Sequence, residues 1–228
     1  TIPISVSKAY GSTVLHHDLF TNGILYLEVG FDLHTIPQEL LPYIGLFSQS
    51  LTQMGTVAED YVKLSQRIGR KTGGVGAERM VMAVRGQEEA KTLLFLSGKS
   101  TMAQAQDMLD IMKDIFLTVK LDNQERFRQI VLKTKARREA GLIPSGHQVA
   151  NRRLKAQLTE SAWFSEQTSG VENLIFLREL LVQIEEDWPS VLAKLEQIKS
   201  ILVNRNTMLS NVTVDAENWA TFRPLLET

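Results

Sequence analysis

Residues 22–33 read NGILYLEVGFDL, and this stretch decides the fold class. The Asn-Gly pair at its start is typical of a tight hairpin turn, because both residues tolerate a positive φ. The strand that follows, residues 24–33, carries apolar residues on both faces along its first half. We expect such a strand to lie in the centre of a sheet and to be covered on both sides.

The segments around this strand alternate between strand and helix signals. A short β-rich strand is predicted before it, at residues 13–19. After it, Pro37 opens a helix that runs to Gly55, since proline fits the first turn of a helix and glycine suits its end. A second helix is predicted at 58–68, and two strands are predicted at 76–84 and 91–97.

The remaining sequence is mostly helical. The spacing of its apolar residues predicts helices at 103–119, 123–142, 150–158, 171–203 and 216–226, and a short strand at 211–214. A break is expected at Trp188-Pro189, because a residue that precedes proline avoids the helical region. This order of predicted strands and helices is not the alternating order of a doubly wound sheet. It predicts one α+β domain over residues 1–228, with a mainly antiparallel sheet and helices packed on one face.

Composition excludes several classes of function. The formal net charge is −1, so no overall charge points to nucleic acid. No cysteine is present, which rules out disulfides, thiolate catalysis and cysteine-ligated zinc. No apolar run approaches the ~20 residues that span a bilayer, so no membrane insertion is expected. The first residue is not methionine, and the chain reads as processed or cut from a longer protein.

The four histidines do not form a metal motif. His16 and His17 are neighbours in a predicted strand, so their side chains point to opposite faces and a structural role is favoured. His34 has no evident acidic partner, and His147 lies at a helix interruption where it caps or bonds a neighbouring segment. No two histidines have the i, i+4 spacing of a helical zinc pair. We therefore predict that this chain binds no metal.

Three other features have competing interpretations. Gly98-Lys99-Ser100 follows a predicted strand, but the first glycine of a phosphate-binding loop is replaced by Leu93. The turn 69–74, with Arg70 and Lys71, is either solvated or a cationic patch that meets an acidic partner or peptide. The basic run between Arg126 and Arg138 is either a solvated helix face or an inter-domain contact.

Several short motifs, spread in order over nearly the whole chain, carry a family resemblance. They are HDLFTN (17–22), ELLP (39–42), SLTQMGT (50–56), IGRKTGG (68–74), VRG (84–86), GKS (98–100), SGH (145–147), WFSEQ (163–167) and EDW (186–188). With these motifs the chain resembles the C-terminal half of the presequence proteases, inverzincin zinc metalloproteases of the pitrilysin/insulinase group.

The resemblance implies a fold and a degenerate site. Four related domains of the LuxS/processing-peptidase-like metallohydrolase fold would enclose a chamber, and the first would bind zinc through H-x-x-E-H. This chain looks like the third domain. Counting back from Gly55-Thr56, the three motif positions fall on Leu46, Gln49 and Ser50. None of these residue types replaces a histidine ligand or a glutamate base, so this domain is expected to be inactive on its own.

The resemblance also suggests partners and two hypotheses of function. In the first, the intact protein is a zinc endopeptidase of unfolded peptides such as cleaved targeting sequences, and this domain supplies chamber wall and contacts with the remaining domains. Arg70 and Lys71 are its candidate substrate contacts. In the second, the chain is a stand-alone binding or assembly subunit of the same fold. The compartments implied are a bacterial cytoplasm, a mitochondrial matrix or a chloroplast stroma.

Overall fold

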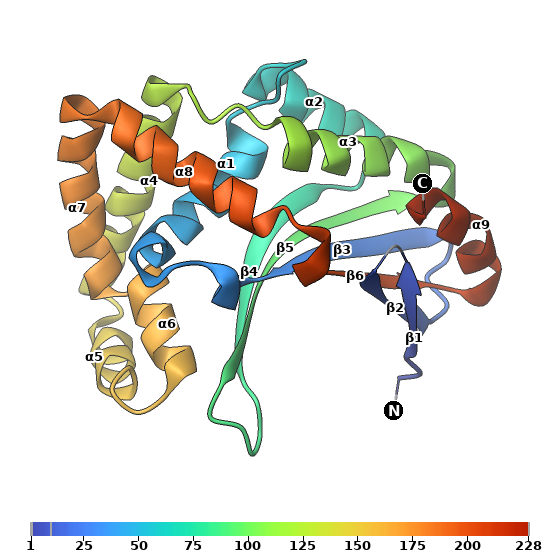
Figure 1. The fold of residues 1–228 in the computed structure, drawn as a ribbon, viewed down its shortest axis with the longest axis horizontal. Helices are drawn as coiled ribbons and strands as arrows, with labels where there is room; N and C mark the ends of the chain where they lie inside the picture. Colours follow the sequence, from blue (N-terminus) through green and yellow to red (C-terminus); the bar gives the residue numbers. More distant parts are fainter. Residues whose placement is uncertain (1, 10, 228) are drawn as a thin grey trace.

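The computed structural model describes residues 2–9 and 11–227, and its centre is one six-stranded sheet. The strand order is β1-β2-β6-β3-β5-β4 (Figure 1). All neighbouring strands are antiparallel except β2 and β6, which are parallel. The strands are β1 (Ser5–Ala9), β2 (Ser12–Asp18), β3 (Ile24–Asp32), β4 (Val75–Ala83), β5 (Ala90–Thr101) and β6 (Met208–Val214).

Helices occupy most of the rest of the described chain. They are α1 (Ile44–Gln53), α2 (Tyr61–Lys71), α3 (Ala105–Thr118), α4 (Gln124–Leu142), α5 (Gly146–Lys155), α6 (Glu160–Ser169), α7 (Val171–Glu186), α8 (Trp188–Leu202) and α9 (Ala216–Leu226). Short 3-10 turns span Leu33–Thr35, Gln38–Tyr43, Met102–Gln104 and Arg205–Thr207. No helix in the described residues is both long and apolar enough to cross a membrane.

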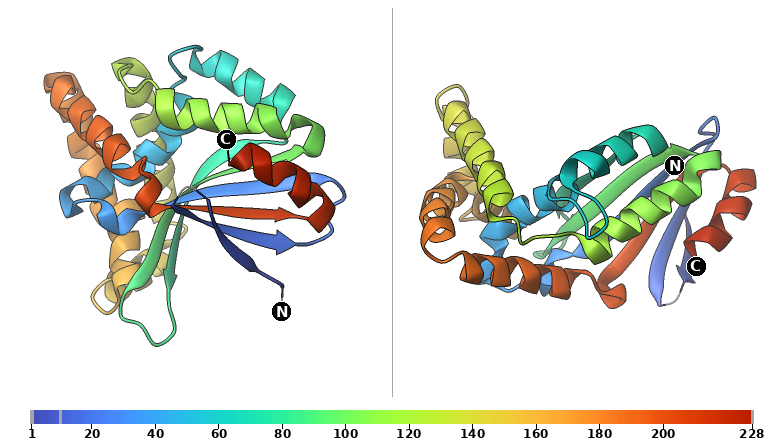
Figure 2. Two further views of the ribbon diagram at one scale, coloured as in Figure 1. Left: turned by 45° about the vertical axis from the view of Figure 1, so that its right-hand side comes forward. Right: turned by 90° about the horizontal axis from the view of Figure 1, so that it is seen from above.

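The core lies between one face of the sheet and the helices above it (Figures 1 and 2). Leu25 and Leu27 of β3 are fully buried there, together with Ile111 and Ile115 of α3. Helices α4 to α7 gather beyond one end of the sheet, and α9 lies at the other end. The predicted α+β class, with a mainly antiparallel sheet and helices on one face, is confirmed.

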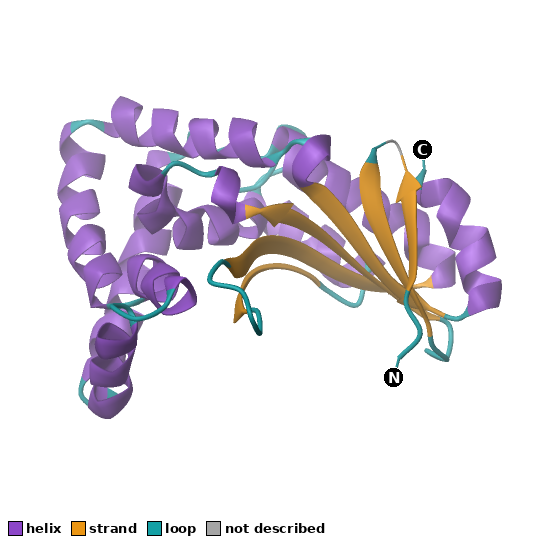
Figure 3. Ribbon diagram, turned by 60° about the horizontal axis from the view of Figure 1, so that its bottom comes forward, coloured by secondary structure: helices purple, strands orange, loops and turns teal. Residues whose placement is uncertain are grey.

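The second face of the sheet is not covered by helices, and the strands curve around it (Figure 3). Tyr26 of β3 points to this side and is 43% exposed, whereas its neighbour Leu27 is fully buried. The expectation of a central β3 is therefore confirmed, but the expectation that both of its faces are covered is wrong. Apolar residues on an exposed face had suggested burial, because sequence alone does not show whether a second layer is present.

Several element boundaries differ from those predicted. Strand β1 and helix α6 were not predicted, and β6 is longer than residues 211–214. Pro37 is followed by a 3-10 turn rather than by the α-helix itself, which begins at Ile44. Pro42 explains this delay, because it has no N–H for an α-helical hydrogen bond. The break between α7 and α8 falls at Asp187, one residue before the predicted Trp188-Pro189.

Residues 98–100 lie inside strand β5, not in a loop after it. A Cβ on Gly98 would come 2.9 Å from Sδ of Met108 on α3. The glycine thus lets helix α3 approach the sheet closely. The GKS segment is a packing feature of a strand, and it has no loop that would surround a phosphate.

Candidate functional site

Helix α1 carries the three positions that the resemblance assigns to a degenerate zinc motif. Leu46 is 2% exposed and Ser50 is fully buried. The Ser50 hydroxyl donates to the carbonyl of Leu46 at 2.9 Å, and Nε2 of Gln49 donates to the carbonyl of Gly45 at 3.1 Å. The polar groups of these two side chains are therefore bonded to their own helix.

Helix α4 closes this site from the other side. The hydroxyl of Thr134 donates to Oε1 of Gln49 at 3.3 Å, and Thr134 is itself buried. Zinc requires imidazole, thiolate or carboxylate ligands, and this site offers a leucine, an amide and two hydroxyls. In the described part of the chain, no group of three or more His, Cys, Asp or Glu side chains is placed to hold a metal ion. The residues present do not fit zinc.

His16 and His17 point to opposite faces of β2, as predicted. Nε2 of His16 lies 3.0 Å from the carbonyl of Val214, and the ring stacks on Trp219 of α9 at 4.5 Å between centroids. His17 lies on the uncovered face, where its Nε2 is 2.8 Å from Oδ1 of Asn211. Both imidazoles therefore make structural contacts, and they do not share a site.

The expectation that His34 lacks an acidic partner is wrong. Its Nδ1 lies 2.9 Å from Asp32, and its Nε2 lies 3.2 Å from Glu160 and 3.7 Å from Glu89. Burial lowers the pKa of His34, but the hydrogen bonds and charges of Asp32 and Glu160 outweigh it and raise the pKa above 6.5. Glu89 and Glu160 are distant in sequence and were not visible there, whereas Asp32 lies only two residues before His34 and was overlooked. His147 is exposed at the start of α5.

Arg70 and Lys71 lie exposed in the last turn of α2. The ammonium of Lys71 is 3.3 Å from Oδ2 of Asp107 on α3. Arg70 has no carboxylate within 4.0 Å among the described residues. Cations are favourable at a helix C-terminus, so this position stabilises α2 whether or not it binds a partner. Arg70 and Lys71 are neighbours in sequence, and they lie on α2, whereas Gln49 lies on α1.

The basic run along α4 does not form one cationic surface. Arg126 stacks over the ring of Tyr61 at 4.0 Å and donates to the carbonyl of Gln53. Arg128 pairs with Glu185 of α7, and Lys135 pairs with Glu139. The contacts of Arg126 and Arg128 join α4 to its neighbours, and the Lys135–Glu139 pair lies within α4, so part of the run serves internal packing.

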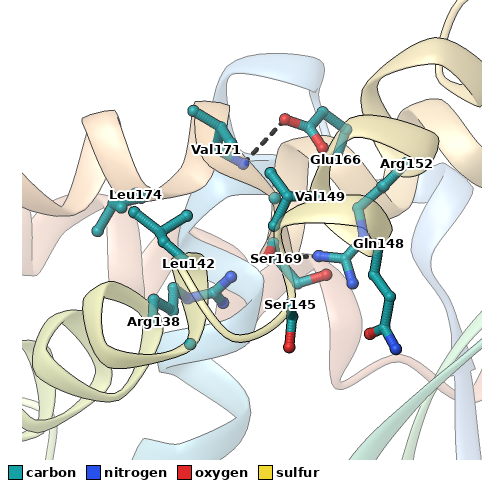
Figure 4. A pocket seen from close by; sticks show the side chains of 12 residues that line it. Arg138, Leu142, Ser145, Gln148, Val149, Arg152, Glu166, Ser169, Val171 and Leu174 are labelled. Atoms are coloured by element: carbon teal, nitrogen blue, oxygen red, sulfur yellow. Dashed lines mark hydrogen bonds between the residues drawn. The ribbon is translucent and has the colours of Figure 1, made fainter.

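Arg138, at the end of this run, turns inward and lines a cavity of about 200 Å³ between α4, α5, α6 and α7 (Figure 4). Arg79 of β4 and Arg152 of α5 approach the same place, where all three guanidiniums donate to carbonyls at the end of α6. This cluster was missed from the sequence. A signal existed, because Arg138 follows the buried residues Phe127, Val131 and Thr134 at helical spacing.

The uncovered sheet face contains a second hollow, of about 480 Å³. A polar chain crosses its floor, since the Asn211 amide donates to Oε2 of Glu28 at 2.8 Å and also meets His17. Apolar side chains surround this chain, namely Leu15, Met80, Leu93, Phe95 and Leu209. The face is thus partly apolar and carries an acidic centre.

Comparison with known proteins identifies relatives that cover nearly the whole chain. The family model of proteins associated with peptidase M16, subfamily C, matches residues 2–180. Presequence protease 1, chloroplastic/mitochondrial, of Arabidopsis thaliana is 40% identical over 217 residues, which is 95% of this chain and 20% of that protein. Protein HypA of Clostridium perfringens is 28% identical over 97% of this chain and 23% of its own length. The chain therefore spans about a fifth of these relatives.

Solved structures show the same fold at low identity. A conserved protein from Enterococcus faecalis V583 has a TM-score of 0.68 at 17% identity, over 99% of this chain and 51% of that one. A structure described as the peptidase M16 inactive domain from Pseudomonas fluorescens has a TM-score of 0.64 at 12% identity, over 97% and 49%. With the family match and the 40% identity, these findings establish that the chain belongs to the family associated with peptidase M16, subfamily C, and is a presequence-protease-like domain.

Proposed function

We propose that this chain is a non-catalytic domain, third in order, of a zinc metalloendopeptidase that degrades unfolded peptides such as cleaved targeting sequences. The proposal rests on helix α1, at the three positions that the resemblance assigns to the zinc motif. The polar groups of Gln49 and Ser50 bond to their own helix and to α4, and Leu46 has no atom that could bind zinc. The zinc would be held by another part of the polypeptide. Zinc content and peptidase activity of this chain by itself are the direct test.

The uncovered sheet face is the part of the domain that we assign to the chamber wall or to contacts with the remaining domains. It presents exposed apolar side chains, including Tyr26 and Met82, around an acidic centre at Glu28 and Glu78. Apolar surface of this kind is favourable only when a partner or substrate removes it from water. Unfolded peptides with apolar and basic residues match both features.

Names of relatives support the compartment that we propose. The Arabidopsis relative is described as chloroplastic/mitochondrial, and the relative from Danio rerio is described as mitochondrial. A chloroplast stroma or a mitochondrial matrix suits the degradation of cleaved targeting peptides. A bacterial cytoplasm is the alternative, because Protein HypA is bacterial.

Arg70 and Lys71 are proposed as contacts for acidic segments of the peptide. Changing both to alanine in the intact protein is expected to raise KM for an acidic unfolded peptide about two- to fivefold at low salt, since exposed charge pairs contribute about 0.2–1 kcal/mol. The value of kcat should not change. Lys63→Ala, on the exposed side of the same helix, is the control. Unchanged kinetics at low salt would show that the turn is only solvated.

A further inference from the structure

The cavity between α4, α5, α6 and α7 has an excess of positive charge. Arg138 and Arg152 line it, Arg79 shares a carbonyl acceptor with Arg138, and the charge of the exposed Arg137 also acts on Arg138. Within residues 2–9 and 11–227, none of the four has a carboxylate within 4.0 Å. Burial and the charges of the other three guanidiniums lower the pKa of Arg138 to about 10. A cationic cluster of this kind is unfavourable unless an anion accompanies it.

Backbone carbonyls hold three of these guanidiniums in place. Thr168 O accepts from Nη1 of Arg79 and from Nη2 of Arg138, both at 3.1 Å. Ser169 O accepts from Nη1 of Arg152 at 3.0 Å. These carbonyls belong to the last turn of α6, so they orient the cations without supplying a formal negative charge. The arginines are therefore ordered before any ligand arrives.

The carboxylate of Glu166 also lines the cavity, its charge acts on Arg138, and its Oε2 has no hydrogen-bond partner. Its Oε1 accepts from the backbone N–H of Val171 at 2.8 Å and of Glu172 at 3.2 Å, which caps the start of α7. The guanidinium of Arg153 lies 3.7 Å from the same oxygen and also pairs with Glu172. Glu166 is thus shared between the start of α7, Arg153 and the cavity, where the two guanidiniums of Arg138 and Arg152 outnumber this one carboxylate.

Arg138 also has an unused donor. An arginine side chain has five N–H donors, and only Nη2 of Arg138 has a protein acceptor. Its Nε is buried and has no hydrogen-bond partner. A buried polar atom without a protein partner often marks the position of an ion or a water molecule.

We propose that this cavity binds a small oxyanion, a phosphate or a carboxylate group, through Arg138 and Arg152. Figure 4 shows the two guanidiniums approaching one space from α4 and α5, with Ser145 and Ser169 beside it. A water molecule occupies about 30 Å³ of liquid, so about 200 Å³ accommodates one such group and some waters. Arginine suits both ligands, because its planar N–H groups match two oxygens at once.

Binding can be measured on the 228-residue chain with sodium phosphate and with sodium glutarate. Each is titrated against sodium chloride at equal ionic strength, and the midpoint of thermal unfolding is followed. At least one of the two is expected to raise the midpoint in a saturable manner, beyond the effect of chloride. A preference for phosphate would identify a phosphate group as the ligand, and a preference for glutarate would identify a carboxylate group. No effect beyond chloride would overturn the proposal.

Variants locate the binding. Arg152→Gln is expected to weaken anion binding at least tenfold, while Lys133→Gln, exposed on the same α4 as Arg138, leaves it unchanged. If Arg152→Gln does not fold, Gln148→Glu is the second variant, because Gln148 is an exposed residue of the cavity wall and the change adds a repelling charge. Equal affinity in a folded cavity variant and the wild type, or an equal loss in Lys133→Gln, would contradict this site.

Discussion

The glycines of the sheet differ in how much space surrounds them for a side chain. Gly30 of β3 lies opposite Phe95 of β5, and a Cβ on Gly30 would come 2.5 Å from Cε1 of that ring. Phe95 therefore covers the glycine on the uncovered face, a pairing that stabilises glycines in sheets. Gly76 of β4 lies in the same sheet, but no atom is within 4 Å of its Cβ position.

Gly30→Ala is expected to destabilise the chain by about 1–3 kcal/mol, because the methyl group must displace the Phe95 ring. The control Gly76→Ala should be neutral or stabilise by up to about 1 kcal/mol, since alanine restricts the unfolded chain more than glycine does. Urea denaturation measures both free energies of unfolding. Equal effects of the two substitutions would mean that the Phe95 contact is not formed.

The His34 cluster predicts a pH dependence. The pKa of His34 is raised in the folded chain, so the protonated imidazole adds stability that is complete below its ordinary value and is lost as the pH rises through the raised pKa. His34→Asn should therefore destabilise more at about pH 6 than at about pH 9. His147→Asn, at an exposed site, is the control in the same urea experiment. A His34→Asn effect of the same size at both pH values would contradict the ion pairs with Asp32 and Glu160.

Sequence could predict local properties of residues but not their long-range partners. The opposite orientation of His16 and His17 follows from strand geometry alone. Glu160, one of the partners of His34, and Thr168, whose carbonyl accepts from Arg138, belong to helix α6, which begins more than a hundred residues after His34. Such contacts depend on topology, and no local pattern contains them.

At the scale of elements, helix signals were the most reliable. Helix α9 has the predicted bounds, and α4 differs by one residue, because apolar spacing agrees with the N-caps that Asn123 and Asp215 provide. Strand β1 was missed because Ser5–Ala9 has little apolar pattern and lies at a sheet edge. Helix α6 was missed because its polar and apolar residues show no clear face, with Glu166 buried among them.

The start of α8 gives an element-scale prediction. Asp187 separates α7 from α8, and its Oδ1 accepts from the N–H of Ser190 at 3.2 Å. Asp187→Ala removes this cap and should lower the free energy of unfolding by about 1 kcal/mol. Glu186→Ala, one residue earlier, removes an exposed acid without a cap and serves as the control. Chemical denaturation of both variants measures their free energies of unfolding. An equal loss of stability in the two would show that the negative charge, and not the cap, stabilises this helix start.

For the whole molecule, the fold class was predictable and the exposure of the sheet was not. The mainly antiparallel arrangement follows from the absence of βαβ alternation. The hairpin expected at Asn22-Gly23 is wrong, because β6 lies between the two strands that this turn joins, β2 and β3. The sequence also predicted that the helices cover only one face of the sheet. The uncovered face retains apolar residues, such as Tyr26 and Leu93, that resemble core residues in the sequence. A sequence cannot distinguish a face that is buried within the domain from one that a further domain or a substrate covers.

The zinc content and peptidase activity of this chain by itself test the proposed function most directly. Purified in the presence of zinc and then dialysed, the chain should retain well below one equivalent of metal by elemental analysis, since Leu46, Gln49 and Ser50 of α1 are not residue types that hold zinc. It should not cleave an unfolded fluorogenic peptide, whereas the intact protein should do so and lose this activity with a chelator. Tight stoichiometric zinc, or chelator-sensitive turnover by the chain alone, would contradict a non-catalytic domain.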